Sequence, residues 1–222
     1  MRITLPSGTA AELATPSSGA PIQGLVVIPD IMGLRPLFDD LASRLAEEYD
    51  LVVCIPEPFP GLEEQPLAWR MDHAGEVGDE RRLADLVAAA DATGVEDVGI
   101  LGFCMGGMLA LKAAGTGRFA RAVAFYGMVR TPDNWKHEGH VEPLDAVTAE
   151  GAAPVLLIAG SEDHWTPAED LAALESAGGT VVVYEGADHG FVHDPSRPAH
   201  RADDAADAWR RAAAFLNGQP PE

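Results

Sequence analysis

The sequence predicts an α/β fold with a mainly parallel central sheet and helices on both of its faces. Short, wholly apolar runs rich in β-branched residues recur along the 222 residues, such as LVVI at 25–28 and VLLIA at 155–159. Runs of this kind are typical of strands that are buried on both faces. Between them lie segments whose apolar residues are spaced three and four apart, as in amphipathic helices. Strands that alternate with helices in this way favour βαβ units and a parallel sheet.

The elements follow one another in a regular order. Residues 2–14 predict a small hairpin around the turn PSG at 6–8, and the proline-rich stretch PEPFPG at 56–61 ends the second buried strand. Helices are expected from Pro36 to Tyr49, around 83–90, at 105–114, after Pro167 and at about 201–216. Strands are expected at 25–28, 51–55, 98–101, 122–125, 155–159 and 181–184.

No internal repeat, low-complexity tract or flexible linker divides the chain, so one domain over 1–222 is expected. Apolar residues make up 47% of the sequence, which is enough to fill one core. Right-handed crossovers place the carboxyl ends of parallel strands on one edge of the sheet, where such sheets bind ligands. Function is therefore to be sought in the loops that follow the strands.

The charge balance excludes several classes of partner. With 15 Lys and Arg against 35 Asp and Glu, the formal charge is −20, which argues against nucleic acid and against an anionic membrane surface. No run is long and apolar enough for a membrane span, and the N-terminus lacks the apolar core of a signal peptide. A cytoplasmic protein is expected. Cys54 and Cys104 are too few for a disulfide framework and have no metal-type spacing.

Cys104 is the candidate nucleophile. It is the central residue of GFCMG at 102–106, a G-x-C-x-G sequence that follows one predicted strand and opens a predicted helix. A sharp strand-to-helix turn requires small flanking residues, and it places the sulfur at a helix N-terminus, where the helix dipole favours the thiolate. Cys54 lies inside the apolar run VVCI and is expected to be a core residue.

A cysteine nucleophile requires a base, and the base requires an acid that orients it. Asp163 follows the strand at 155–159, and His189 follows the strand at 181–184, in the chain order that this type of site uses. Glu162 remains an alternative acid, since an acid at a strand end is as often a turn residue or a helix cap. The other histidines near this end of the chain, at 164, 193 and 200, are expected to be surface groups.

The segment HEGH at 137–140 superficially resembles a zinc site. Its histidines are three residues apart in a polar loop, whereas the zinc motif places them four apart on a helix. The sequence therefore predicts no metal.

Three segments together resemble the dienelactone hydrolase family: GFCMGG at 102–107, GSEDH at 160–164 and ADHGF at 187–191. The resemblance extends from about 24 to 216. It implies an α/β-hydrolase fold, no cofactor, and a Cys104–His189–Asp163 triad that cleaves an ester or enol-lactone. It also implies that Asp30, in the segment IPDIMG at 28–33, interacts with the resting thiol.

The resemblance further implies that the N–H groups of Ile31 and Met105 form an oxyanion hole. The sequence departs from the family pattern at two positions. Asp30 stands where the family usually has glutamate, and His193 stands where members that act on dienelactone have a carboxylate-binding arginine. The candidate substrate-binding residues are Tyr126, His193, Arg70 and Arg81. Arg82 is a further arginine that precedes the Cys104 turn.

The expected function is cysteine-dependent hydrolysis of a small ester or lactone through an acyl-enzyme. A thioesterase or acyl transferase that uses the same triad is the alternative enzyme. A catalytically silent member that binds a small ligand is the alternative from another class. The sequence is compatible with a monomer and with a homodimer.

Overall fold

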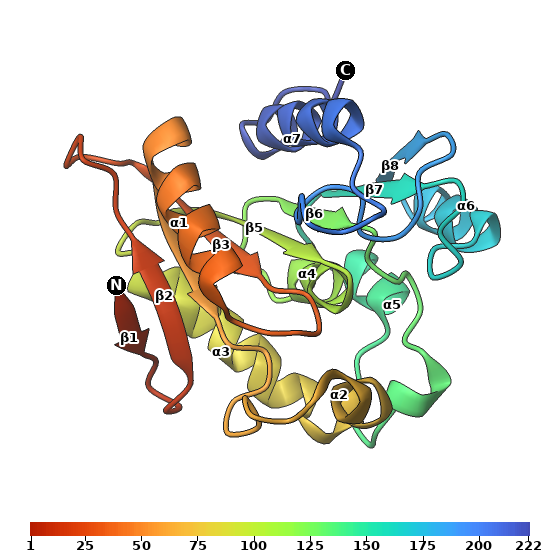
Figure 1. The fold of residues 1–222 in the computed structure, drawn as a ribbon, viewed down its shortest axis with the longest axis horizontal. Coiled ribbons are helices and arrows are strands. Elements are labelled where there is room, and N and C mark those ends of the chain that lie inside the picture. Colours follow the sequence, from red (N-terminus) through yellow and green to blue (C-terminus); the bar gives the residue numbers. More distant parts are fainter.

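The computed structural model describes residues 1–222 and contains one eight-stranded sheet. The strand order is β1-β2-β4-β3-β5-β6-β7-β8. β3 to β8 run parallel, while the β1–β2 hairpin joins the edge antiparallel to β4. The predicted mainly parallel sheet is confirmed (Figure 1). The strands are β1 (Arg2–Thr4), β2 (Ala10–Ala14), β3 (Gln23–Ile28), β4 (Leu51–Pro56), β5 (Asp97–Phe103), β6 (Ala122–Phe125), β7 (Val155–Gly160) and β8 (Thr180–Tyr184).

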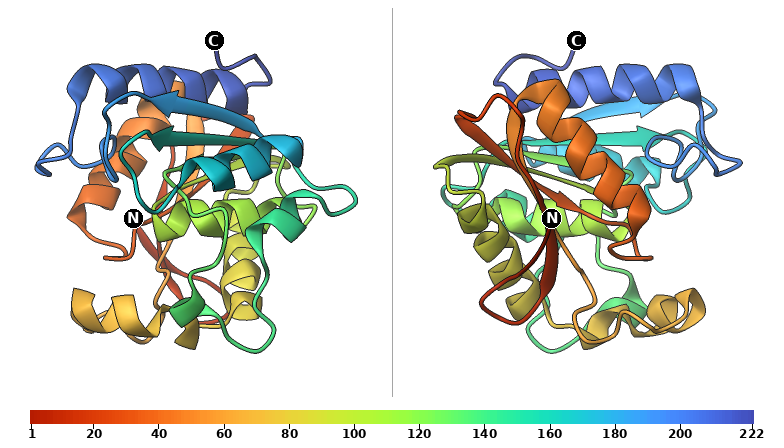
Figure 2. Two further views of the ribbon diagram at one scale, coloured as in Figure 1. Left: turned by 90° about the vertical axis from the view of Figure 1, so that its right-hand side faces the viewer. Right: turned by 60° about the vertical axis from the view of Figure 1, so that its left-hand side comes forward.

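Helices cover both faces of the sheet, as Figures 1 and 2 show. α1 (Pro36–Tyr49) and α7 (Ala202–Leu216) pack on one face, and α3 (Asp79–Ala92), α4 (Met105–Ala114) and α6 (Ala168–Ser176) on the other. Side chains of a strand alternate between the faces, so Val26 and Ile28 belong to the core under α3 and α4. Leu25 and Val27 belong to the core under α1 and α7. Both faces of the sheet are buried under helices, which explains why the strand sequences are wholly apolar.

The register of the central strands brings three loops together at one edge. Ile28 at the end of β3 pairs with Gly102 of β5, and Phe103 pairs with Phe125 at the end of β6. The chain segments that follow these strands therefore begin next to one another. They carry Asp30, Cys104 and Tyr126.

The sequence patterns missed two short helices, α2 (Leu67–His73) and α5 (Pro143–Val147). The only buried residue of α2 is Arg70, so this helix buries no stripe of apolar side chains that a sequence pattern could reveal. α5 has five residues, too few for a helical period to be recognised. All of the predicted elements are present, and Cys54 is fully buried in β4. None of the helices is both long and apolar enough to cross a bilayer.

Candidate active site

Cys104 occupies the sharp turn between β5 and α4. Its backbone lies at φ 57° and ψ −120°, a strained conformation for a residue with a side chain. The flanking glycines are required by space: a Cβ on Gly102 would lie 2.1 Å from the carbonyl oxygen of Gly106. A Cβ on Gly106 would lie 2.4 Å from the carbonyl oxygens of Ile28 and Pro29. The turn therefore packs directly against the loop that follows β3.

Asp163 and His189 follow β7 and β8, and their side chains meet. Nδ1 of His189 lies 2.8 Å from Oδ2 of Asp163, whose other oxygen accepts the N–H of Trp165 at 2.9 Å. The Asp163 side chain is completely buried, whereas the neighbouring Glu162 is exposed. Asp163 is thus the carboxylate that orients the imidazole.

His189 is poised to hold a proton. Burial alone would lower its pKa, but the hydrogen bond to Asp163 and the neighbouring Cys104 raise the pKa to about 10. Because Nδ1 is engaged by Asp163, Nε2 is the nitrogen that remains for the sulfur. Nε2 is buried and has no hydrogen-bond partner in the protein. Asp163 and His189 are thus joined through Nδ1, and the second ring nitrogen is unoccupied.

Two backbone N–H groups are free at the mouth of the Cys104 turn. The N–H of Ile31 donates to no acceptor in the protein, and Met105 is the first residue of α4, where an N–H has no intrahelical acceptor. The close approach of Gly106 to Ile28 and Pro29 brings these two segments side by side. Both N–H groups are therefore unoccupied within the protein.

Asp30 has partners other than the thiol. Oδ1 accepts from Arg35 Nη1 at 2.7 Å and from the N–H of Met32 at 3.0 Å. Oδ2 accepts from Arg35 Nη2 at 2.9 Å and from His193 Nε2 at 2.8 Å. These donors fill the roughly four lone-pair sites of a carboxylate. The expected contact between Asp30 and Cys104 is absent, because Asp30 has no acceptor site left.

His193 is placed differently from expectation. Its side chain is fully buried, with Nε2 on Asp30 and Nδ1 2.5 Å from the Tyr126 hydroxyl. Tyr126 is itself buried and lies edge-on to His189, with ring centroids 5.1 Å apart. Neither side chain has a free polar atom for a substrate, because each bonds to the other. A network of protein groups replaces the substrate contact expected at 193.

The expected arginine clamp is also absent. Arg70 is buried, donates to the carbonyl oxygens of Ile31 and Gln65, and lies over the ring of Phe59. Arg81 is half exposed on α3, with Asp85 3.9 Å away as its partner. Both guanidinium groups are engaged by neighbouring groups of the protein.

One arginine outside the predicted set, Arg197, lies beside the residue that follows His189. Nη1 of Arg197 is close enough to Gly190 that a Cβ there would be 2.5 Å away. Arg197 is half-buried, makes no side-chain hydrogen bond or ion pair, and its charge acts on both Tyr126 and His193. It stands eight residues after His189 in a turn-rich loop, where no pattern of spacing singles it out.

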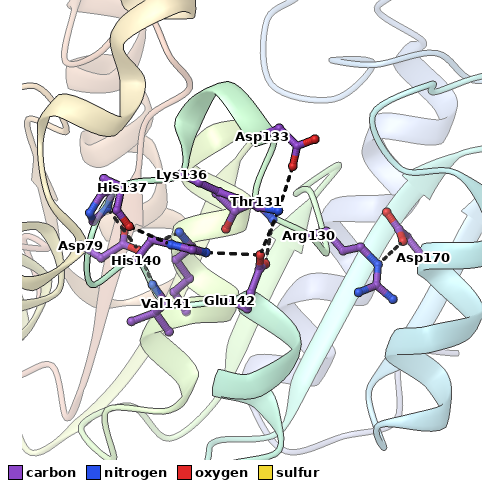
Figure 3. Close-up of polar contacts among 11 residues, drawn as sticks. Asp79, Arg130, Thr131, Asp133, Lys136, His137, His140, Val141, Glu142 and Asp170 are labelled. Atoms are coloured by element: carbon purple, nitrogen blue, oxygen red, sulfur yellow. Dashed lines mark hydrogen bonds and ion pairs between the residues drawn. The ribbon is translucent and has the colours of Figure 1, made fainter.

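The histidines at 137 and 140 pair with separate carboxylates (Figure 3). His137 Nε2 lies 3.8 Å from Asp79, and His140 Nε2 lies 3.5 Å from Glu142. Asp79 also receives Nζ of the buried Lys112 at 2.9 Å. No group of three or more His, Cys, Asp or Glu side chains is arranged to hold a metal ion. The segment instead anchors the loop between β6 and α5.

The chain is similar to known proteins along most of its length. A model of the dienelactone hydrolase family matches residues 9–219. A Bradyrhizobium protein described as a probable 2-oxo-3-(5-oxofuran-2-ylidene)propanoate lactonase is 31% identical, over 93% of this chain and 88% of that protein. A Rhodococcus opacus carboxymethylenebutenolidase is 30% identical, over 86% and 79% respectively.

Among solved structures, a Klebsiella pneumoniae protein classed as a dienelactone hydrolase superposes with a TM-score of 0.84 at 26% identity. The superposition covers 98% of this chain and 97% of that one, which confirms the α/β-hydrolase fold. The chain therefore belongs to the dienelactone hydrolase family and is a hydrolase of carboxylic esters.

Proposed function

We propose that Cys104 is the nucleophile of this hydrolase, with His189 as its base and Asp163 as the acid that orients the base. The observation that carries the proposal is the 2.8 Å contact of His189 with a fully buried Asp163, behind a cysteine held in a strained turn. A base oriented in this way can remove the thiol proton through Nε2.

The resting state follows from the charges. The pKa of His189, raised to about 10, favours an imidazole that keeps the proton it takes from the sulfur. No further acid is needed to activate the sulfur. This agrees with Asp30, whose oxygens are all engaged by Arg35, His193 and a backbone N–H.

The reaction proceeds in two halves. Sγ of Cys104 bonds to the substrate carbonyl carbon, and the N–H groups of Ile31 and Met105 hold the oxyanion. The carbon–oxygen bond then breaks, and His189 gives its proton to the leaving oxygen, so that a thioester on Cys104 remains. His189 next takes a proton from water, whose oxygen attacks the thioester, and the acid leaves with regeneration of the thiolate.

Arg197 supports a substrate class: small esters or lactones that carry a carboxylate near the scissile bond. A half-buried guanidinium without a partner, next to the residue that follows His189, is available to a substrate anion. The lactone in the name of the Bradyrhizobium relative is a propanoate, so it carries such a group. The net charge of −20 opposes an anion only weakly, since distant charges are screened over about 8–10 Å.

The acyl-enzyme can be tested directly. An excess of a chromogenic ester mixed with the protein should release one equivalent of leaving group per protein in a burst, and intact mass should show one acyl group, mapped to Cys104. Cys54→Ala serves as the matched control and should keep the burst, while Cys104→Ala should lose it. A burst that survives in Cys104→Ala would overturn the nucleophile. Oxyester and thioester substrates compared in the same assay separate the esterase from the thioesterase alternative.

A further inference from the structure

A buried chain of hydrogen bonds runs behind the proposed active site. It connects Tyr126, His193, Asp30 and Arg35, in that order. The His193 ring is stacked on Phe103 with centroids 4.6 Å apart, so its orientation is fixed by packing as well as by hydrogen bonds. None of these contacts is a step of the reaction described above. This hydrogen-bonded chain nevertheless contacts both the proposed base and the loop of the proposed oxyanion hole.

The protonation states along the chain follow from the partners. Burial would raise the pKa of Asp30, but the hydrogen bonds from His193 and Arg35 hold it well below its usual range. Asp30 is therefore ionised and can only accept, so His193 donates from Nε2. Burial raises the pKa of Tyr126 well above its usual value, so the phenol keeps its proton and donates it to Nδ1. One neutral tautomer of His193 satisfies both bonds.

One end of the chain contacts the base. The Tyr126 ring meets the His189 ring edge-on, with centroids 5.1 Å apart and planes at 63°. Tyr126 lies at φ 41°, a left-handed conformation that a bulky residue adopts only when its surroundings hold it there. The bond from its hydroxyl to His193 is the polar contact that fixes the ring. Movement of the Tyr126 ring would therefore move a wall of the His189 site.

The other end contacts the loop of the proposed oxyanion hole. Oδ1 of Asp30 accepts the N–H of Met32, the residue after Ile31, and so fixes the peptide that follows the oxyanion donor. Residues 30 and 193 are joined at 2.8 Å although 163 positions separate them in the chain. His193 is thus the single side chain that connects the wall of the base to the oxyanion loop.

We propose that His193 is a positioning residue, which acts through Tyr126 on His189 and through Asp30 on the loop of Ile31. It contacts no substrate, because its side chain is fully buried and both ring nitrogens are occupied. The inference rests on the proposed function, since it concerns the alignment of that thiol, base and oxyanion hole. A displacement of about 1 Å at such a site can cost up to about a hundredfold in rate.

Three substitutions separate the links of the chain. Tyr126→Phe removes only the hydroxyl, and His193→Leu removes both bonds. His193→Gln keeps one donor for Asp30 and one acceptor for Tyr126. Tyr184→Phe is the matched control, because it removes a comparable hydroxyl bond, 2.7 Å to Asp207, between β8 and α7.

Two readouts are measured for each variant: kcat and KM for a chromogenic ester, and the rate of Cys104 alkylation by iodoacetamide between pH 5 and 9. Tyr126→Phe and His193→Leu should lower kcat about tenfold or more, with little change in KM. Both should shift the alkylation midpoint to higher pH, because a less well-held imidazolium stabilises the thiolate less. His193→Gln should recover most of both effects, and Tyr184→Phe should change neither.

The double variant Tyr126→Phe/His193→Leu should be no slower than His193→Leu, since the two residues act in series. Multiplied losses, or an unshifted alkylation midpoint in both single variants, would overturn the inference. Tyr126→Phe keeps the test decisive if His193→Leu does not fold. Alkylation requires no ester turnover, so a wild type without hydrolysis whose variants still show the shift would refute the proposed function and leave the positioning role standing.

Discussion

Asp163 contacts His189 through one carboxylate oxygen and the N–H of Trp165 through the other, at 2.8 Å and 2.9 Å. A carboxylate fixed from both sides cannot turn away from the imidazole, and so it holds His189 in one tautomer with Nε2 directed away from the acid. The neighbouring Glu162 has neither contact and is exposed to solvent. Burial thus distinguishes two adjacent acids that the sequence leaves equivalent.

Asp163→Asn should lower kcat for a chromogenic ester by about 10²- to 10⁴-fold, because an amide cannot stabilise the imidazolium and favours the wrong tautomer. The substitution keeps the size of the side chain, so the far-UV circular dichroism should be unchanged. Glu162→Gln is the control on the adjacent residue and should retain wild-type turnover. If the effects of the two substitutions were exchanged, the acid would be Glu162.

The two cysteines should differ in their response to pH. Burial in β4 raises the pKa of Cys54 to about 12, so its thiolate is negligible at any pH below about 11. The thiolate is the nucleophilic form, and a group with a raised pKa gains it only as the pH rises through that value. Cys104 is only partly buried and lies beside His189 at the start of α4, where a reagent can reach its sulfur. Brief iodoacetamide treatment at pH 7 followed by peptide mapping should label Cys104 alone; label on Cys54 would contradict the assignment.

Arg197→Gln should reduce the preference for substrates that carry a carboxylate. A charge-assisted hydrogen bond contributes about 1.5–3 kcal/mol, which corresponds to roughly 10- to 150-fold in kcat/KM. The comparison is between an ester with a free carboxylate and its methyl ester, in the wild type and in the variant. Arg201→Gln is the control, because Arg201 is already engaged by the carbonyl oxygen of Glu185 and by Asp204. A wild type that treats both esters alike would show that Arg197 does not bind substrate.

The central sheet and the loop positions of Cys104, Asp163 and His189 after their strands could be predicted because they depend on local patterns. A fully apolar run such as LVVI at 25–28 reports burial on both faces, and the parallel register then brings the loops after the strands together. The glycines around Cys104 are dictated by contacts shorter than 3 Å, which any larger residue would violate. These constraints are readable in the sequence itself.

The surroundings of the triad could not be predicted, because they depend on contacts between distant segments. In the sequence, Asp30 is compatible with a contact to the thiol and His193 with a contact to substrate, and only the fold shows that they bind each other. Arg70 is buried by its own helix packing, while Arg197 is left without a partner. Whether a polar side chain is already paired is decided by tertiary structure, and composition or spacing does not report it.

The ion pair of Asp79 and Lys112 should be the main polar anchor of the loop between β6 and α5. Both side chains are 2% exposed, and Asp79 also accepts the N–H of Val141 at 2.7 Å (Figure 3). Lys112→Met should therefore lower the free energy of unfolding by about 3–5 kcal/mol, because it leaves a buried carboxylate without its charge partner. Urea denaturation measures the loss.

The double variant Asp79→Leu/Lys112→Met should recover part of that stability, since burying two apolar side chains avoids the uncompensated charge. It should not recover the anchor of the loop, because the N–H of Val141 then has no acceptor. Lys136→Met is the exposed counterpart, with its partner Asp133 96% exposed, and should leave the urea midpoint unchanged. A Lys112→Met protein as stable as the wild type would mean that Asp79 is neutral or hydrated in the folded protein, and the loop would then be held by Glu142 through Thr131 instead.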